Sequence, residues 1–366
     1  MRLTNFWWLL IWLFLFGSLS YLFIPQQTEM IHGRPQVRWK WVPAAALALP
    51  YVIWAAWRSN GYGDTGMYRS TFQKMPTGLS SLVSYVSSRS KGKLFVIFEY
   101  LFKTLVSHSE IVFFFVVAFI QLYFIVRIFR KYSADFWLSM FLFVASTDYL
   151  SWMHNGIRQF LAVTLIFTCL PLLTRKKYVL MCAVILAATL IHSTALVFLP
   201  FVFVINGRAW NKRTLLYILA LVVAIIFLDH VSDFIVRAME DTAYEGDIDI
   251  FLADDGTNIV RVLFYAVPTV MAWVFRSYID RANDPMINIC VNLSVISSGV
   301  YVLSYFTSGI LVGAIPIYFS LANYVLIPWL LEEVFESRSK AFLEMIFLGV
   351  YTAFFYYQCG PTWGLL

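Results

Sequence analysis

Charged residues are scarce in this sequence. Asp, Glu, Lys and Arg make up 13% of its 366 residues, and 60% of the residues are hydrophobic. A soluble globular domain has about 25% charged residues. The mean hydropathy is +0.73. The composition therefore excludes an ordinary soluble fold and indicates a membrane protein.

Cysteine pairs and nucleotide-binding motifs are also missing. The four cysteines, at positions 169, 182, 290 and 359, form no C-x-x-C pair, so neither a disulfide framework nor a zinc site is indicated. The sequence contains no Walker motif and no glycine-rich phosphate-binding fingerprint. We therefore expect no cofactor, no resident metal, no ATP hydrolysis and no nucleic-acid partner.

Long apolar runs are abundant instead. Most are about 14–22 residues long, which is roughly the length that a helix needs to cross a ~30 Å hydrocarbon core. They lack the alternating pattern of a transmembrane barrel. We expect spans at residues 6–24, 42–57, 111–129, 136–150, 157–173, 178–191, 195–205, 215–228, 259–275, 286–306, 310–331 and 342–357. The sequence thus predicts an all-α integral membrane protein, a polytopic helical bundle of about 12 transmembrane helices in a single domain (1–366).

The basic residues between these runs predict the orientation of the chain. Short loops rich in Lys and Arg stay in the cytoplasm. Both termini are then external, as are the loop at 58–108 and an acidic loop at 229–258. One part of the first loop conflicts with the charge rule, because residues 58–93 carry six basic side chains: Arg58, Arg69, Lys74, Arg89, Lys91 and Lys93.

Residues 94–108 predict a helix that lies on the membrane surface. The apolar positions of this segment recur at helical spacing. Glu99 and Lys103, at i and i+4, are expected on the opposite face. An interfacial helix with this pattern keeps the loop at 58–108 external.

The segment from Arg58 to Tyr68 is the first candidate for a functional site. Gly and Asn residues allow the chain to turn back after the second apolar run. Asp64 and Tyr68 share one face if a helix restarts there. Asp64 is then a candidate general base or an acceptor of sugar hydroxyls, and Arg58 and Tyr68 are candidate substrate contacts. The alternative is an ordinary exposed turn.

The segment from Asp148 to Gln159 is the second candidate, at the start of the fifth span. Arg158 stands near a helix N-terminus, where the helix dipole opposes a cation, so it requires an anionic partner such as a pyrophosphate. The alternatives are that Arg158 extends to the lipid headgroups or pairs with Asp148. The candidate substrate contacts here are Asp148, His154, Asn155 and Gln159.

Two single residues complete the candidate set. His192 lies in an external turn, where it could exchange a proton near neutral pH or simply hydrogen-bond a helix end. Arg261 enters the membrane below the acidic loop, as a second phosphate contact or as a residue that reaches the headgroups. Together the candidates place arginines, a carboxylate and a histidine on one side of the membrane, which is typical of a site for a lipid-linked anion.

The order of these motifs resembles the EpsG family of exopolysaccharide proteins, which are Wzy-like polysaccharide polymerases. The shared pattern is Arg58, Gly-Asp64-x-x-x-Tyr68, Asn-Gly-Ile-Arg158-Gln159-x-Leu-Ala162, a basic Arg-Lys-Lys turn, Ile-His192-Ser-x-Ala-Leu and Gly-Thr-Asn258-x-x-Arg261. An Asp in the first external loop, followed by a helix on the membrane, is also similar to the C-type (GT-C) glycosyltransferases, which use polyprenyl-linked sugars.

The resemblance implies a multi-pass enzyme of the bacterial plasma membrane with its active site on the external face. Such an enzyme joins oligosaccharide repeat units carried on undecaprenyl pyrophosphate, and its partners would be that substrate, the lipid bilayer and other polysaccharide export proteins. Asp64 or His192 would take a proton, and Arg158, with Arg261, would hold the pyrophosphate. The arrangement requires no metal, although Asp64 and Asp148 could hold one if their loops converge.

Two alternative functions can be compared with the same sequence features. A GT-C glycosyltransferase that moves one sugar from a polyprenyl monophosphate would need the same residues. A transporter for a lipid-linked glycan would predict inverted repeats and ionisable residues at mid-membrane, and the sequence shows neither.

Overall fold

The structure is a computed structural model, and it describes all residues except 1–5, 24–26, 32–33, 90, 229, 231, 233–235, 238–247 and 366. Half of the acidic loop predicted at 229–258 lies outside the described residues. The contacts between residues divide the chain into two compact units. Each unit is described by itself, and the prediction of one polytopic membrane domain stays a prediction.

The first unit contains residues 1–169, 187–193 and 331–366. Its elements are α1 (Trp7–Phe23), β1 (Gln27–Ile31), β2 (Arg34–Arg38), α2 (Trp41–Ala56), α3 (Thr65–Lys74), η1 (Leu79–Ser81), α4 (Leu82–Ser87), α5 (Lys93–Leu105), α6 (Glu110–Tyr132), α7 (Phe136–Ala145), η2 (Tyr149–Asn155), α8 (Ile157–Cys169), α20 (Ser337–Tyr357) and η5 (Gln358–Thr362). The two strands form an antiparallel hairpin in which Gln27 pairs with Arg38.

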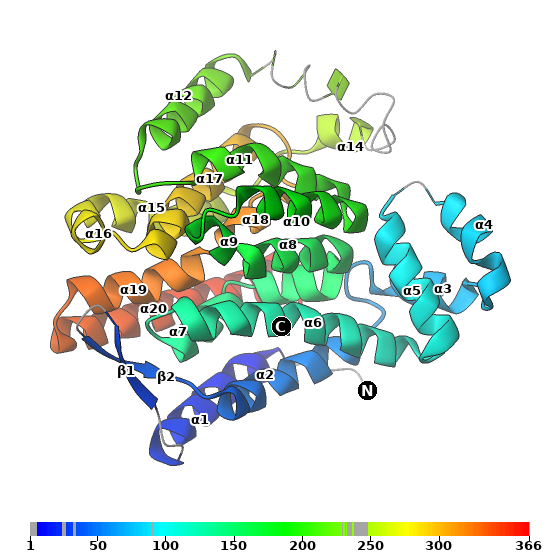
Figure 1. The fold of residues 1–366 in the computed structure, drawn as a ribbon, viewed down its shortest axis with the longest axis horizontal. Helices are drawn as coiled ribbons and strands as arrows, with labels where there is room; N and C mark the ends of the chain where they lie inside the picture. The colour runs from blue at the N-terminus through cyan, green and yellow to red at the C-terminus, as the bar shows by residue number, and fades with distance from the viewer. Residues whose placement is uncertain are drawn as a thin grey trace. The chain divides into compact units, whose positions relative to one another are not determined.

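The core of the first unit is built around α6. This helix packs along α2 on one side and along α8 on the other, as Figure 1 shows. Its inward residues Leu122, Ile125 and Phe129 are at most 1% exposed. They recur at spacings of three and four, which places them on one side of the helix. The central position of α6 explains why elements before and after it in the sequence meet.

A group of short helices, α3 to α5, lies at one end of α6 (Figure 1). Lys103 of α5 joins this group together. Its Nζ donates hydrogen bonds to the carbonyl oxygens of Phe72, Gln73 and Met75, at 2.7, 2.9 and 2.6 Å. These carbonyls lie at the end of α3, where a helix has too few backbone N–H groups to satisfy all of its carbonyls, although that of Phe72 also accepts from the N–H of Met75. A buried ammonium group therefore fixes α3 to α5.

The structure buries the charged residues of α5. The helix itself is confirmed, since residues 94–108 were predicted and Lys93–Leu105 are helical. Glu99 and Lys103 are buried, at 4% and 7% exposed, whereas Leu94 and Leu105 are 38% and 66% exposed. The sequence predicts both charged residues on the face opposite the apolar positions, and it is this face that neighbouring elements bury. Neighbouring charges offset only part of the cost of burying Glu99, because the loss of water remains the largest effect on its pKa.

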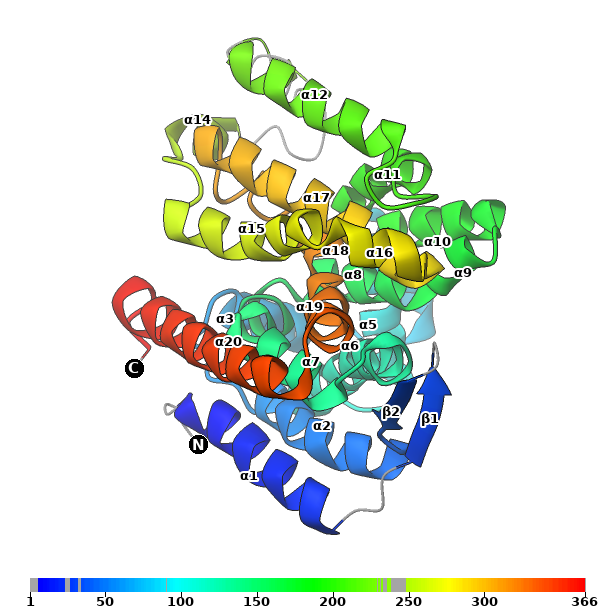
Figure 2. The ribbon, with the colours of Figure 1, turned by 90° about the vertical axis from the view of Figure 1, so that its left-hand side faces the viewer.

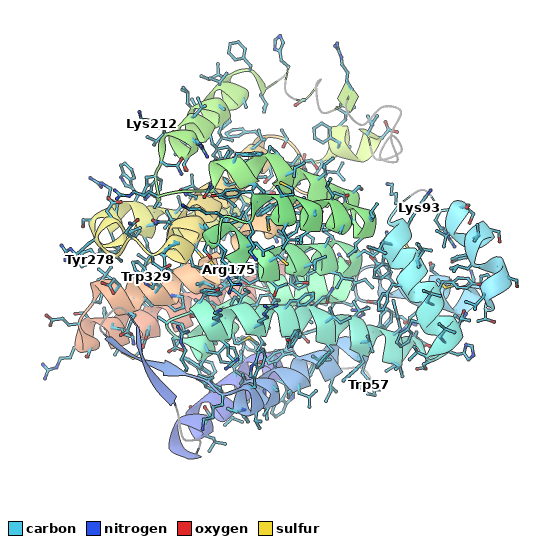
Figure 3. All side chains as sticks on the ribbon, in the orientation of Figure 1. Trp57, Lys93, Arg175, Lys212, Tyr278 and Trp329 are labelled. Atoms are coloured by element: carbon cyan, nitrogen blue, oxygen red, sulfur yellow. The ribbon has the colours of Figure 1, made fainter. Side chains whose placement is uncertain are left out.

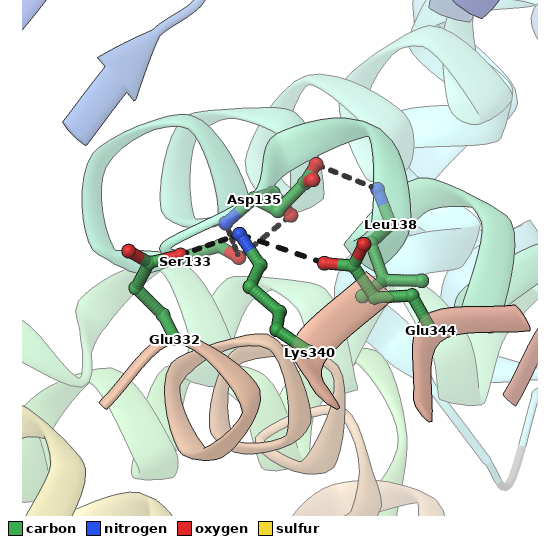
Figure 4. Close-up of polar contacts among 6 residues, drawn as sticks. All are labelled: Ser133, Asp135, Leu138, Glu332, Lys340 and Glu344. Carbon is green, nitrogen blue, oxygen red and sulfur yellow. Dashed lines mark hydrogen bonds and ion pairs between the residues drawn. The ribbon is translucent and has the colours of Figure 1, made fainter. Parts of the chain in front are cut away.

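A cluster of charges connects the C-terminal helices to α7. Lys340 Nζ lies 2.6 Å from Glu332 Oε2 and 3.6 Å from Glu344 Oε1. Asp135 lies beside them and caps α7 by accepting a hydrogen bond of 2.9 Å from the backbone N–H of Leu138 (Figure 4). A carboxylate is favourable at a helix N-terminus because it satisfies a free N–H group.

The second unit contains residues 170–186 and 194–330. Its elements are α9 (Pro171–Thr174), α10 (Tyr178–Ile191, whose last turn belongs to the first unit), η3 (Ser193–Val197), α11 (Phe198–Val204), α12 (Lys212–Ile226), α14 (Ile248–Ala253), α15 (Ile259–Val274), α16 (Arg276–Ala282), α17 (Pro285–Phe306), α18 (Ile317–Ser320) and α19 (Asn323–Val334, whose end belongs to the first unit). Helix α17 packs along α15 and α12 (Figure 2).

Several helices are long and apolar enough to cross a membrane. Among the described residues there are four, Glu110–Tyr132, Ile157–Thr174, Pro285–Phe306 and Ser337–Thr362, and a fifth if α15 and α16, bent by 66°, form one span. Shorter apolar helices of 10–17 residues accompany them. Helix α12 exposes a run of large apolar side chains that suits contact with lipid. These features fit a polytopic helical membrane protein, but the predicted count of about 12 spans is not confirmed.

Two predicted spans are interrupted. In the segment predicted as 310–331, helix begins only with α18 at Ile317 and continues after a break in α19. Gly309 lies against the backbone of Gly256 and Thr257, and Gly313 lies against the carbonyl group of Gly309. In the segment predicted as 136–150, α7 ends at Ala145, and Thr147 has a φ of 70°. This conformation lies outside the helical region and stops α7.

Candidate active site

The loop after α2 is fixed to the turn that precedes α8. Trp57 follows α2 directly (Figure 3). Arg58 is 4% exposed, donates a hydrogen bond of 2.7 Å from Nη1 to the carbonyl oxygen of Met153, and places its guanidinium carbon 4.1 Å from the ring centroid of Phe114. Burial lowers its pKa to about 10. Nε and Nη2 have no hydrogen-bond partner within the described part of the chain. Arg58 is thus a charged support beneath the loop.

Asp64 stands at the entrance of α3. Its backbone N–H donates a hydrogen bond of 2.8 Å to Asn155 Oδ1, and its side chain is exposed. Gly63, with a φ of 49°, lies against the same Asn155 side chain, where a Cβ would collide with it. Helix α3 begins at Thr65, which meets the condition under which Asp64 and Tyr68 were expected to share one face. Asn155 therefore holds the turn at Asp64 in place.

His154 is enclosed by aromatic rings in the same turn. It is 1% exposed, and its ring centroid lies 4.8 Å from that of Tyr149 and 5.6 Å from that of Tyr62. Burial, assisted by the charge of Arg58, lowers the pKa of His154 to about 3. The ring is therefore neutral at physiological pH. This environment gives His154 a supporting position, whereas the sequence placed it among the substrate contacts.

A pocket of about 220 Å³ opens between α3, α4, α5 and the start of α8. Its polar lining consists of Tyr68, Thr71, Tyr85, Arg89, Lys91, Glu99 and Arg158. Three of these side chains are cationic and one is a carboxylate. The excess of positive charge favours an anionic ligand.

Arg158 enters this pocket from the first turn of α8. Its guanidinium carbon lies 5.9 Å from the ring centroid of Tyr68, which comes from α3. Burial raises the pKa of Tyr68, whereas the charge and hydrogen bond of Arg158 lower it. Arg158 Nε is buried and has no hydrogen-bond partner among the described residues. An anion that entered the pocket would supply one.

Glu99 faces Arg158 from α5. Burial raises the pKa of this carboxyl to about 7, and the charges of Arg158, Arg89 and Lys103 oppose the shift. Arg89 is held at the pocket by a hydrogen bond of 2.7 Å from Nη2 to the hydroxyl of Tyr85. The pocket therefore contains a carboxyl that changes its charge near neutral pH.

His192 approaches the pocket from the end of α10. Burial lowers its pKa to about 4, and the nearby charges of Arg158 and Lys91 lower it further. The segment around Gly92 lies very close to the end of α10 and to Arg158. Gly92 has a φ of 64°, and a Cβ added to it would lie 2.8 Å from the carbonyl oxygen of Ile191 and 3.6 Å from Arg158 Nη1. Only glycine fits this position without strain.

The structure brings together part of the predicted site. Tyr68, Arg158 and His192 converge on the pocket, and Asp64 is near enough that its charge raises the pKa of Tyr68. The remaining predicted residues take other positions. Arg58, His154 and Asn155 support the surrounding turns. Asp148 and Gln159 are buried, at 0% and 8% exposed. Arg261 belongs to the second unit, where its guanidinium carbon lies 5.9 Å from the ring centroids of both Tyr265 and Tyr301.

Sequence reasoning missed Glu99, Arg89 and Lys91 as pocket residues. Two features of the sequence could have indicated these residues. The basic residues at 58–93 conflicted with the charge rule for an external loop, and three of the pocket's polar side chains come from residues 85–91. Glu99 stood out as an acid in an otherwise apolar helix, and such residues usually face the protein interior.

A metal is not needed to explain this arrangement of charges. Among the described residues, no group of three or more His, Cys, Asp or Glu side chains is placed to hold a metal ion. The cations of Arg158, Arg89 and Lys91 can balance the charge of an anionic ligand.

Comparison with known proteins gives one match. The sequence profile of the EpsG family matches residues 42–359. This range includes α2 to α20 and every polar residue that lines the pocket. No curated protein and no solved structure matches the chain.

Proposed function

Since the chain belongs to the EpsG family, whose members are Wzy-like polysaccharide polymerases, we propose that it joins oligosaccharide repeat units carried on undecaprenyl pyrophosphate. The observation that supports this best is the pocket that Arg158, Arg89 and Lys91 line. A volume of about 220 Å³ is below the ~300 Å³ of typical small-molecule sites, so it suits a diphosphate group and the reacting end of a glycan, and leaves the rest of the glycans and the lipid outside.

The proposed reaction transfers one glycan to another. A hydroxyl oxygen of the acceptor glycan attacks the anomeric carbon of the donor glycan and forms the new glycosidic bond. The bond from that carbon to the pyrophosphate oxygen breaks, and undecaprenyl pyrophosphate leaves with the bonding electrons. The hydroxyl proton passes to a base. Arg158 would neutralise the leaving group, and its planar guanidinium can contact two phosphate oxygens at once.

The lipid-linked glycans that accumulate without the protein test this function. We expect a strain that lacks the gene to accumulate intact single repeat units on undecaprenyl pyrophosphate and to make no polymer, as measured by mass spectrometry of the lipid fraction. The chain restored on a plasmid should reverse both effects. A truncated repeat unit would instead indicate the GT-C glycosyltransferase, and unchanged polymer would refute both enzymes.

The proposed location is the bacterial plasma membrane, with the pocket on the external side. We expect a cysteine at Gly61 to react with a membrane-impermeant maleimide added to intact cells, and one at Arg175 to react only after lysis. Gly61 is exposed and has no atom within 4 Å of its Cβ position, and Arg175 is exposed.

The labelling should be done in a variant whose four native cysteines are replaced. Labelling of position 175 but not of position 61 in intact cells would reverse the orientation. It would place the pocket in the cytoplasm.

A further inference from the structure

Glu99 supplies the one carboxylate among the described residues that line the pocket. It is 4% exposed and comes from α5, so it is held by a helix and not by a loop. Its carboxylate makes no hydrogen bond to any residue that the structure describes, although charges surround it. Its oxygens are therefore available to a ligand in the pocket.

The groups that face Glu99 come from four parts of the unit. Arg158 lies on α8, Tyr68 on α3 and Tyr85 on α4, while Arg89 and Lys91 precede α5. Lys103 is on the same helix as Glu99, but its ammonium group already donates to three backbone carbonyls of α3 and of the residue that follows it. Because these three bonds use all three of its protons, Lys103 cannot also hydrogen-bond Glu99.

We propose that Glu99 is the proton acceptor of the transfer reaction. This inference rests on the proposed function. The acceptor hydroxyl donates its proton to a carboxylate oxygen of Glu99 while its own oxygen bonds to the anomeric carbon of the donor glycan. The pyrophosphate leaves with the electrons of the broken bond and is held by Arg158. Glu99 then releases the proton to water, which restores the carboxylate.

The other two candidate bases are less suited to this role. Asp64 is exposed and does not line the pocket. His192 has a pKa of about 4, whereas that of Glu99 is about 7. A base is most effective when its pKa is close to the working pH, because it is then ionised correctly and still binds a proton well.

The pH dependence of polymerisation tests the proposal. The assay uses the full-length protein in proteoliposomes, with the lipid-linked repeat units that accumulate in the deletion strain, at limiting substrate. For the wild type we expect the rate to rise about tenfold from pH 6 to pH 8 and then to level off, because Glu99 must be deprotonated. Glu99→Gln should lower the plateau rate about 100-fold or more and remove this rise.

Three variants separate this role from a structural one. Glu99→Asp should restore part of the rate and move the rise to lower pH, because Asp has the lower intrinsic pKa. Asp64→Asn and His192→Gln should each keep the rise where it is in the wild type. The proposal would be overturned if Glu99→Gln kept the rise in rate with pH while Asp64→Asn or His192→Gln lost it.

The outcomes also distinguish this inference from the proposed function. Wild-type protein that makes no polymer from these substrates would refute the function and, with it, the role of Glu99. A wild type that polymerises, beside a Glu99→Gln variant within threefold of its rate at every pH, would refute only the role of Glu99. If Glu99→Gln did not insert, the shifted profile of Glu99→Asp would decide, and an unshifted profile would overturn the inference.

Discussion

Arg158→Lys should lower the polymerisation rate roughly ten- to a hundred-fold while the protein is inserted at its normal level. Lysine keeps the charge but replaces a planar fork by a compact ammonium group, which cannot contact two phosphate oxygens in the same way. The loss of one charge-assisted hydrogen bond is worth about 1.5–3 kcal/mol, which corresponds to this fall in rate if the contact forms fully in the transition state. The measurement is the initial rate of polymer formation per amount of inserted protein.

Two further variants show whether Arg158 holds the substrate or the fold. Arg158→Gln removes the charge and should lower the rate beyond the effect of lysine. Arg127→Lys makes the same exchange at an exposed position of α6, so its rate should stay near that of the wild type. Activity near normal in Arg158→Lys, or a loss that only follows the protein level, would show that Arg158 has a structural role.

Gly92→Ala should reduce the rate at least tenfold. The residue has a φ of 64°, and an added Cβ would lie 2.8 Å from the carbonyl oxygen of Ile191. The left-handed conformation costs an L-residue about 1–2 kcal/mol. The contact is with backbone, which cannot rotate away as a side chain can. The segments at 91–92 and 191–192 must therefore separate, which moves Lys91 and His192 away from Arg158.

The matched control is Gly61→Ala. At this position an added Cβ meets no atom within 4 Å, so both the rate and the thermal stability in detergent should stay near those of the wild type. Gly92→Ala should lower the rate by a larger factor than its change in stability explains. Equal rates for the two variants would show that the close approach of these segments does not shape the pocket.

The helices of the first unit could largely be predicted from the sequence. The helix at Lys93–Leu105 was predicted at 94–108, and α3 begins one residue after Asp64, directly after the turn that the sequence indicated. These predictions succeeded because they rest on local signals, namely the helical spacing of apolar residues and the turn-forming glycines. The interruption after Ala145 was not predicted, because the positive φ of Thr147 has no signal in the residue type.

The composition of the pocket could be predicted only in part. Arg158 was recognised because a cation near the N-terminus of an apolar helix requires a partner. Glu99 was not recognised as a pocket residue, since the spacing in α5 places it opposite the apolar residues but does not show which face is buried. In water the apolar face packs inward, whereas in a membrane protein the charged face can do so. That choice depends on the neighbours of α5, which are distant in the sequence.

The three hydrogen bonds of Lys103 give the pocket one rigid wall. They join α5 to the end of α3, so Glu99 on one helix and Tyr68 on the other are carried by a single body. The cations on the opposite side are long, flexible side chains. Lipid-linked substrates of different shape would therefore be accommodated by movement of Arg158 and Arg89, while the distance from the base to Tyr68 stays constant. The pocket would then combine tolerance for differences between substrates with accuracy in placing the attacking hydroxyl.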